Sequence, residues 1–186
     1  MSEVKVNKKL NLVAHLEETG MGEIYVHSTP IMRETFEQYY APIARAFTRI
    51  FATPIAHASG PRVAKLVIRD EAMAIGTWEG TNGVKQGLFE EIRRLTHVVT
   101  LQGGKWQHVP IEEAKLLDAD DIATIENYIS FFTVASAIQG KSELRETMSI
   151  TSTIWPLRLE SLNVTDYVAG LQMSKTDVTT GKKETV

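Results

Sequence analysis

The sequence predicts one α+β domain that is mostly helical, and three features of the chain support this. Residues 118–140 carry apolar side chains at helical spacing around more than half of the circumference, which is typical of a central helix. Alternating apolar and polar residues around a glycine-containing turn predict an N-terminal β-hairpin at 10–27. We expect a single globular domain over 1–171 and a flexible polar tail over 172–186.

Two helices are predicted between the first hairpin and the middle of the chain. Thr29-Pro30 is typical of a helix start, and apolar residues at spacings of three and four continue to Phe51, with Pro42 kinking or dividing this helix. Gly60-Pro61 predicts the start of the next helix. The residues that we expect on its inward face are Val63, Leu66, Val67 and Met73.

The elements on either side of the central helix are shorter. Residues 84–95 predict an amphipathic helix, 97–109 a second short hairpin and 111–117 a brief helix that leads into the central one. In the central helix, Asp118 is suited to cap the start and Gly140 to end it with a left-handed backbone.

Two further helical stretches are predicted after Gly140. The first starts near Ser142 and ends before Trp155-Pro156. The second, at 157–171, is amphipathic and short enough that it needs to dock on the domain.

The composition argues against several classes of protein. The net charge is −3 and the isoelectric point is about 6.0, so the chain has no general attraction for nucleic acid. Cysteine is absent, which excludes disulfides, zinc–cysteine sites and thiol catalysis. No apolar run approaches the ~20 residues that cross a bilayer, so we expect no membrane association and a cytosolic protein.

The sequence indicates no catalytic, cofactor-binding or metal-binding residues. The first hairpin can bring His15 and His27 face to face, but no histidine stands at ligand spacing to another ligand. Asp118, Asp120 and Asp121 are explained by helix-start electrostatics without a bound ion. We therefore expect no cofactor, no metal and no enzyme activity.

Six segments, in this order along the chain, carry a resemblance to a known family. They are Lys8-Lys-Leu-Asn-Leu-Val13, Ile24-Tyr-Val-His-Ser-Thr-Pro-Ile31, Gly60-Pro-Arg-Val-Ala64, Gly87-Leu-Phe-Glu-Glu-Ile-Arg-Arg-Leu-Thr-His-Val-Val99, Phe131-Phe-Thr-Val-Ala-Ser-Ala137 and Ser161-Leu-Asn-Val-Thr-Asp166. In these segments the chain resembles the tail assembly chaperones of long-tailed bacteriophages, and the likeness runs over most of its length.

The resemblance implies a non-enzymatic protein of the host cytoplasm. Such a chaperone binds the tape measure protein until tail tube subunits polymerise around it, so the tail tube protein is a further implied partner. A tape measure protein is long and largely helical with exposed apolar stripes, and a partner with an apolar groove suppresses its aggregation. Whether the chain forms a homo-oligomer stays open.

Two stretches are candidates for that groove, and each is equally well explained as part of the core. The first is the aromatic helix and the second is the predicted C-terminal helix. The candidate partner-binding residues are Phe36, Tyr40 and Phe47 in the former and Leu159, Leu162, Tyr167 and Leu171 in the latter.

The family resemblance also implies a programmed ribosomal frameshift. Gly181-Lys182-Lys183 is compatible with a slippery GGG-AAA-A heptamer, although other codons encode the same tripeptide. A polar tail before the junction is what a fused second domain needs.

Two other readings compete with the chaperone. One is a virion structural protein of the tail or head–tail connector, whose hairpins add to the sheets of neighbouring subunits in a ring. The other is an enzyme of an unrecognised type, for which the sequence contains no motif.

Overall fold

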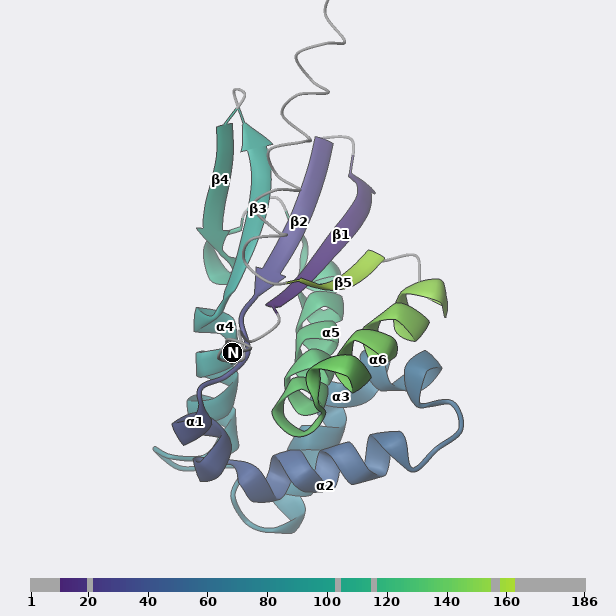
Figure 1. Ribbon diagram of the computed structural model, residues 1–186. Helices are drawn as coiled ribbons and strands as arrows, with labels where there is room; N and C mark the ends of the chain where they lie inside the picture. The colour runs from purple at the N-terminus through teal and green to yellow at the C-terminus, as the bar shows by residue number, and fades with distance from the viewer. Residues whose placement is uncertain (1–10, 20–21, 103–104, 115–116, 155–157, 163–186) are drawn as a thin grey trace, which may run out of the picture.

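The computed structural model of the chain describes residues 11–19, 22–102, 105–114, 117–154 and 158–162. It shows the predicted α+β domain, mostly helical, with one antiparallel sheet. In Figure 1 the sheet lies in the upper part of the molecule. Helices α2 (Tyr40–Phe51), α3 (Ala56–Ala74) and α6 (Lys141–Ile154) lie in the lower part, while α5 (Ala119–Ile138) reaches from behind the sheet into the helical part.

Within the described residues the sheet has five strands in the order β4-β3-β2-β1-β5, and every neighbouring pair is antiparallel. Both predicted hairpins are confirmed, as β1–β2 and β3–β4, and the sheet joins them side by side through β2 and β3. The strands are β1 (Asn11–Thr19), β2 (Gly22–Ser28), β3 (Thr96–Gln102), β4 (Lys105–Pro110) and β5 (Arg158–Leu162).

The prediction of a helix over 157–171 is wrong where the structure describes this segment. Arg158–Leu162 is strand β5, and Asn11 pairs with Leu162 at one end of its ladder with β1. Without β5, β1 would leave a row of backbone N–H and C=O groups unpaired at the sheet edge, so pairing outweighs the local helical pattern. Tyr167 and Leu171, with the predicted tail at 172–186, lie outside the described residues.

The predicted aromatic helix is divided, as the proline indicates. Helix α1 (Arg33–Gln38) and helix α2 (Tyr40–Phe51) meet at Tyr39, and Pro42 lies in the first turn of α2, where its missing N–H costs no hydrogen bond. The predicted start at Thr29-Pro30 is wrong, because the Thr29 N–H donates to the Leu95 carbonyl at 3.1 Å and the helix begins after Met32.

Helix α3 (Ala56–Ala74) begins before Gly60-Pro61, and the predicted inward face is largely wrong. Val63, Leu66 and Met73 are exposed, whereas only Val67 packs partly against the core. The buried side is made instead of small residues and one isoleucine, because α3 lies close against both α2 and α5. The buried residues of α3 are Ala56, Gly60, Pro61, Ala64, Ile68 and Ala72.

The predicted helix at 84–95 forms in two parts. A π-helical turn, η1 (Val84–Leu88), leads into α4 (Phe89–Arg94), and Val84, Leu88 and Ile92 form its buried side. The brief helix predicted after β4 is a single 3₁₀ turn, η2 (Ile111–Glu113).

The central helix is α5 (Ala119–Ile138), and its predicted cap is confirmed. One carboxylate oxygen of Asp118 accepts the N–H groups of Asp120 at 2.9 Å and Asp121 at 2.8 Å, while the Asp121 carboxylate accepts the Asp118 N–H at 3.3 Å. This reciprocal pair accounts for the acidic group without a bound ion.

The role predicted for Gly140 is wrong. Among the described glycines only Gly76 and Gly80 have a positive φ, so Gly140 does not end α5 with a left-handed backbone. It precedes α6 (Lys141–Ile154), where the Gly140 carbonyl accepts the Leu144 N–H at 2.9 Å and the Glu143 carboxylate accepts the Gly140 N–H at 3.0 Å. Gly140 therefore caps the helix that follows, which ends before Trp155-Pro156 as predicted.

One hydrophobic core joins the sheet to the helices. On the inner face of the sheet Leu12, Val26 and Val98 are almost fully buried, and they belong to the same cluster as Ile129 and Phe132 of α5. Alternation along the strands places Tyr25, His27 and Val99 on the opposite, outer face.

A polar network links three of the helices at the edge of this core. The Glu126 carboxylate of α5 accepts hydrogen bonds from Lys65 of α3 and, at 2.9 Å, from Arg93 of α4. Burial would raise the pKa of Glu126, but the hydrogen bonds from Lys65 and Arg93 outweigh burial, and the pKa is lowered. Glu126 therefore stays ionised and ties the three helices together at neutral pH.

The crossing of α2, α3 and α5 gives a test of the packing. A methyl group at Gly60 would lie 2.7 Å from the Phe131 ring and 2.9 Å from Ile50. We expect Gly60→Ala to lower the free energy of unfolding by about 2 kcal/mol, because overpacking outweighs the gain in helix propensity. Urea unfolding measures this change. The neighbouring Ser59→Ala should stay within about 0.5 kcal/mol of the parent, and an equal or greater stability of Gly60→Ala would contradict the close crossing.

Candidate partner-binding surface

Exposed large apolar side chains gather in the helical part of the molecule. They come from α2, α3, α5 and α6 and from the segments beside them. Among the residues whose exposure the structure describes, these side chains are Met32, Tyr40, Ile55, Val63, Leu66, Met73, Ile138, Ile150 and Ile154. A contiguous apolar surface is typical of a site that binds another macromolecule, whereas single exposed apolar side chains are normal.

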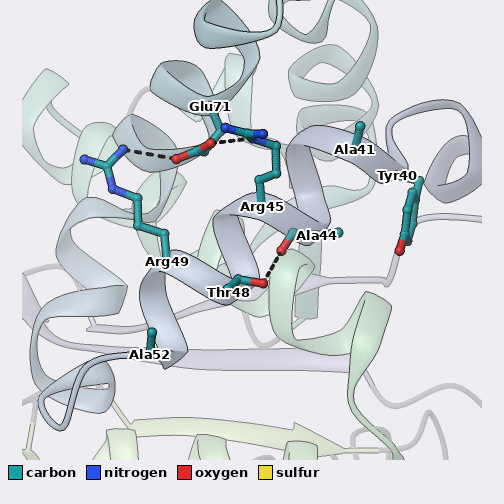
Figure 2. A pocket seen from close by; sticks show the side chains of 8 residues that line it. All are labelled: Tyr40, Ala41, Ala44, Arg45, Thr48, Arg49, Ala52 and Glu71. Carbon is teal, nitrogen blue, oxygen red and sulfur yellow. Dashed lines mark hydrogen bonds and ion pairs between the residues drawn. The ribbon is translucent and has the colours of Figure 1, made fainter.

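A groove of about 600 Å³ follows the outer side of α2 (Figure 2). We call it the α2 groove. Its lining comes from α2, from the residue that follows it and from one residue of α3. The lining residues are Tyr40, Ala41, Ala44, Arg45, Thr48, Arg49, Ala52 and Glu71.

The α2 groove arises from the helical repeat of α2. One side of the helix, including Ile43, Ala46 and Ile50, is buried against the core. The opposite side presents only small residues along the floor of the groove, because alanine or threonine recurs at spacings of three and four from Ala41 to Ala52. The Thr48 hydroxyl donates to the Ala44 carbonyl at 3.0 Å, so its hydrogen bond is satisfied within the helix (Figure 2).

One edge of the α2 groove is charged. The Glu71 carboxylate accepts a hydrogen bond from Arg45 Nε at 2.7 Å and from Arg49 Nη1 at 3.3 Å. The Glu71 side chain is only 13% exposed, whereas those of Arg45 and Arg49 are 53% and 54% exposed. Two guanidinium groups share one carboxylate, so this edge carries excess positive charge and exposed N–H donors.

The α2 groove has the chemistry of a binding surface. The Glu71 carboxylate is held by two cations, and the Thr48 hydroxyl donates to a backbone carbonyl. Neither group is placed as a general base beside a nucleophile. The apolar floor and cationic edge suit an amphipathic partner instead.

The structure places the predicted partner-binding residues in three settings. Tyr40 is 58% exposed, lines the α2 groove and contacts the Phe36 ring edge-on at 5.7 Å. Phe36 and Phe47 are half-buried against the core, and Phe47 stacks on Phe51 at 4.6 Å. The other four candidates lie on β5 or beyond the described residues.

Sequence reasoning missed most of the lining. The predicted residues in this region are large aromatic residues, whereas the floor of the groove consists of small residues on the side of α2 that faces away from the core. The available signal was the recurrence of alanine and threonine where a surface helix usually carries long polar side chains. The pairing of Arg45 and Arg49 with Glu71, across the loop between two helices, had no sequence signal.

A second exposed apolar stripe runs along α3. Leu66 is 45% exposed and Met73 57% exposed, and Val63 lies on the same side of the helix. Arg69 and Asp70, which form an ion pair at 3.2 Å, lie between Leu66 and Met73 along the helix. The positions predicted to be internal therefore extend the apolar surface of the helical part.

The outer face of the sheet carries histidines close together. The register sets His27 opposite His97, and His108 lies opposite Val99, one alternation along the next strand. The expectation that His15 and His27 face each other is wrong, because His15 pairs with Tyr25. Across the described residues, no three histidine or acidic side chains are grouped so as to hold a metal ion.

Burial disfavours protonation of this histidine group. Burial, together with the nearby His108 and His97, lowers the pKa of His27 to about 4. Burial and His97 also lower the pKa of His108.

None of the helices in the described part of the chain combines the length and the apolar character that crossing a membrane requires.

His27 predicts a pH dependence of stability. Its pKa is about 4 in the folded protein and 6.5 in an unfolded chain, so the unfolded state binds more protons between these values. The contribution of the neutral His27 side chain to the free energy of unfolding is therefore complete above pH 6.5 and is lost as the pH falls toward 4. Because His27 is only half-buried, we expect a loss of about 2 kcal/mol.

Urea unfolding at neutral and at mildly acidic pH measures this loss. The variant His27→Gln should show a smaller dependence on pH over this range than the parent. If the stability of His27→Gln depended on pH as strongly as that of the parent, other titratable side chains would be responsible for the pH dependence.

Comparison with known proteins returns no relative. No protein-family model, curated protein or solved structure matches the chain. The function proposed for the chain therefore rests on the geometry of the α2 groove and on the residues of the chain.

Proposed function

We propose that the chain is a bacteriophage tail assembly chaperone that acts in the host cytoplasm, has no enzyme activity, and binds the tape measure protein while the tail tube polymerises. The α2 groove is the observation that supports this proposal most directly. It is an open surface along a whole helix, with an apolar floor and one charged edge. This shape suits the side of another helix better than a small substrate.

The ordered resemblance of six segments supports the same function. Three of these segments lie within α3, η1–α4–β3 and α5, and most of their residues are in helices. A chaperone for a long helical protein needs an exposed apolar surface that does not cause the chaperone itself to aggregate. The α2 groove and the α3 stripe meet that need, because arginine and acidic side chains accompany the apolar residues in both.

A virion structural protein of the tail or head–tail connector is the second candidate. Among the described strands, β4 and β5 lie at the two edges of the sheet, and an edge strand can pair with a strand of a neighbouring subunit. Rings of defined mass in analytical ultracentrifugation would favour this candidate over the chaperone.

Co-expression with the tape measure protein of the same phage tests the proposed function. The parent chain should keep the tape measure protein soluble and copurify with it. Thr48→Arg places a long cation on the groove floor and should reduce copurification at least tenfold, since a clash in a helix-docking groove costs more than about 1.4 kcal/mol. Thr124→Arg, the same substitution at an exposed site on α5, is the matched control and should bind like the parent.

Two results would count against this function. An insoluble tape measure protein in the presence of the parent chain would refute chaperone activity. Equal copurification of Thr48→Arg and Thr124→Arg would move the binding site away from the α2 groove.

The native gene gives an independent test. Expressed with its own downstream DNA, it should yield the 20.8 kDa product and a minor longer product that diverges near Gly181, because a slippery heptamer can encode Gly181-Lys182-Lys183. Intact mass spectrometry measures both. A single protein product would contradict the frameshift. The proposed chaperone function would then depend on the copurification experiment alone.

A further inference from the structure

The dimensions of the α2 groove fit the side of one α-helix. Helix α2 has 12 residues, so the groove runs for about 18 Å, or three helical turns. Small residues at Ala41, Ala44 and Ala52 permit a close approach, and helices that pack through small residues lie near the short end of the usual 8–10 Å separation.

The charged edge makes the two sides of the α2 groove different. Arg45 contacts Glu71 through Nε and Arg49 contacts it through one terminal nitrogen, while the second terminal nitrogen of Arg49 points away from Glu71 (Figure 2). Among the described residues, Glu71 is the acidic partner of both arginines. Glu71 therefore holds two guanidinium groups in place and leaves an excess of one positive charge.

We infer that the α2 groove binds an amphipathic helix of the tape measure protein whose apolar stripe is flanked on one side by aspartate or glutamate. The apolar stripe packs on the alanine floor, and the acidic flank pairs with Arg45 and Arg49 beside Glu71. Because only one edge of the groove is cationic, a helix with one acidic flank binds in one direction along α2. This inference rests on the proposed function and specifies the segment that is recognised.

Charge also argues against a second copy of the chain packed antiparallel on α2. In an antiparallel twofold pair of α2 helices packed face to face, the charged edges of both copies lie on the same side. That side would collect four guanidinium groups and only two carboxylates, since each copy supplies Arg45, Arg49 and Glu71. Repulsion disfavours this pairing.

A set of helix-forming peptides of about 20 residues tests the inference. The peptides share one apolar stripe and carry glutamate, glutamine or lysine along one flank. Binding to the full chain is measured by fluorescence anisotropy. The acidic peptide should bind about tenfold more tightly than the neutral one and the lysine peptide more weakly still, because two half-exposed ion pairs together give about this factor.

A charge-inverted variant makes the test independent of folding defects. The triple variant Arg45→Glu, Arg49→Glu and Glu71→Arg keeps ion pairs across the same positions and reverses the excess charge, so the peptide preference should reverse. The control Arg33→Glu with Arg145→Glu introduces two charge reversals on exposed sites of α1 and α6 and should keep the parent preference. Circular dichroism confirms that each variant is folded.

Each outcome decides the inference. An equal affinity for all three peptides, no binding to any of them up to millimolar concentration, or a preference unchanged in the triple variant would overturn it. Concentration-dependent dimerisation of the parent that Thr48→Arg abolishes would instead assign the α2 groove to a second copy. The copurification experiment distinguishes failure of this inference from failure of the proposed function. A soluble complex with the tape measure protein, but no preference for acidic peptides, refutes this inference alone. A preference for acidic peptides without such a complex refutes the proposed function.

Discussion

The contact of Phe131 with Gly60 is the interaction on which the arrangement of the helices depends. Phe131 of α5 is fully buried, and its ring lies against the bare backbone of α3 and stacks on Phe51 of α2 at 5.5 Å. Burial of a phenylalanine side chain stabilises a protein by about 2–3 kcal/mol, and a single side chain here serves three helices. The direction in which α2 leaves this crossing determines where its outer side faces.

The α2 groove follows from that crossing. Because Ile43, Ala46 and Ile50 are buried in the core, the opposite side of α2 faces the solvent. Arg45 and Arg49 reach across to α3 and are fixed there by Glu71. Half-exposed ion pairs of this kind contribute little to folding, so the arrangement has its main effect on the shape and charge of the surface.

The sequence predicts the elements with strong local signals and misses those set by distant partners. The α5 cap could be predicted because Asp118 and Asp121 satisfy each other within one turn, and the hairpins because alternation is local. The inward side of α3 could not be predicted from hydrophobicity, since close packing favours Gly60 and Ala64 over Leu66. Strand β5 depends on a partner at the other end of the chain, and the α2 groove on an arginine–glutamate contact between two helices.

The pairing of β1 with β5 has a consequence for how the protein folds. The ladder joins Asn11 to Leu162, so the sheet closes only after almost every other described element has been synthesised. Contacts between such distant residues slow folding, because a long loop must close before the strands gain any hydrogen bonds. Until then β1 is an open edge that other strands can pair with. The protein that we propose to keep another chain from aggregating thus passes, during its own synthesis, through a stage in which it can aggregate itself.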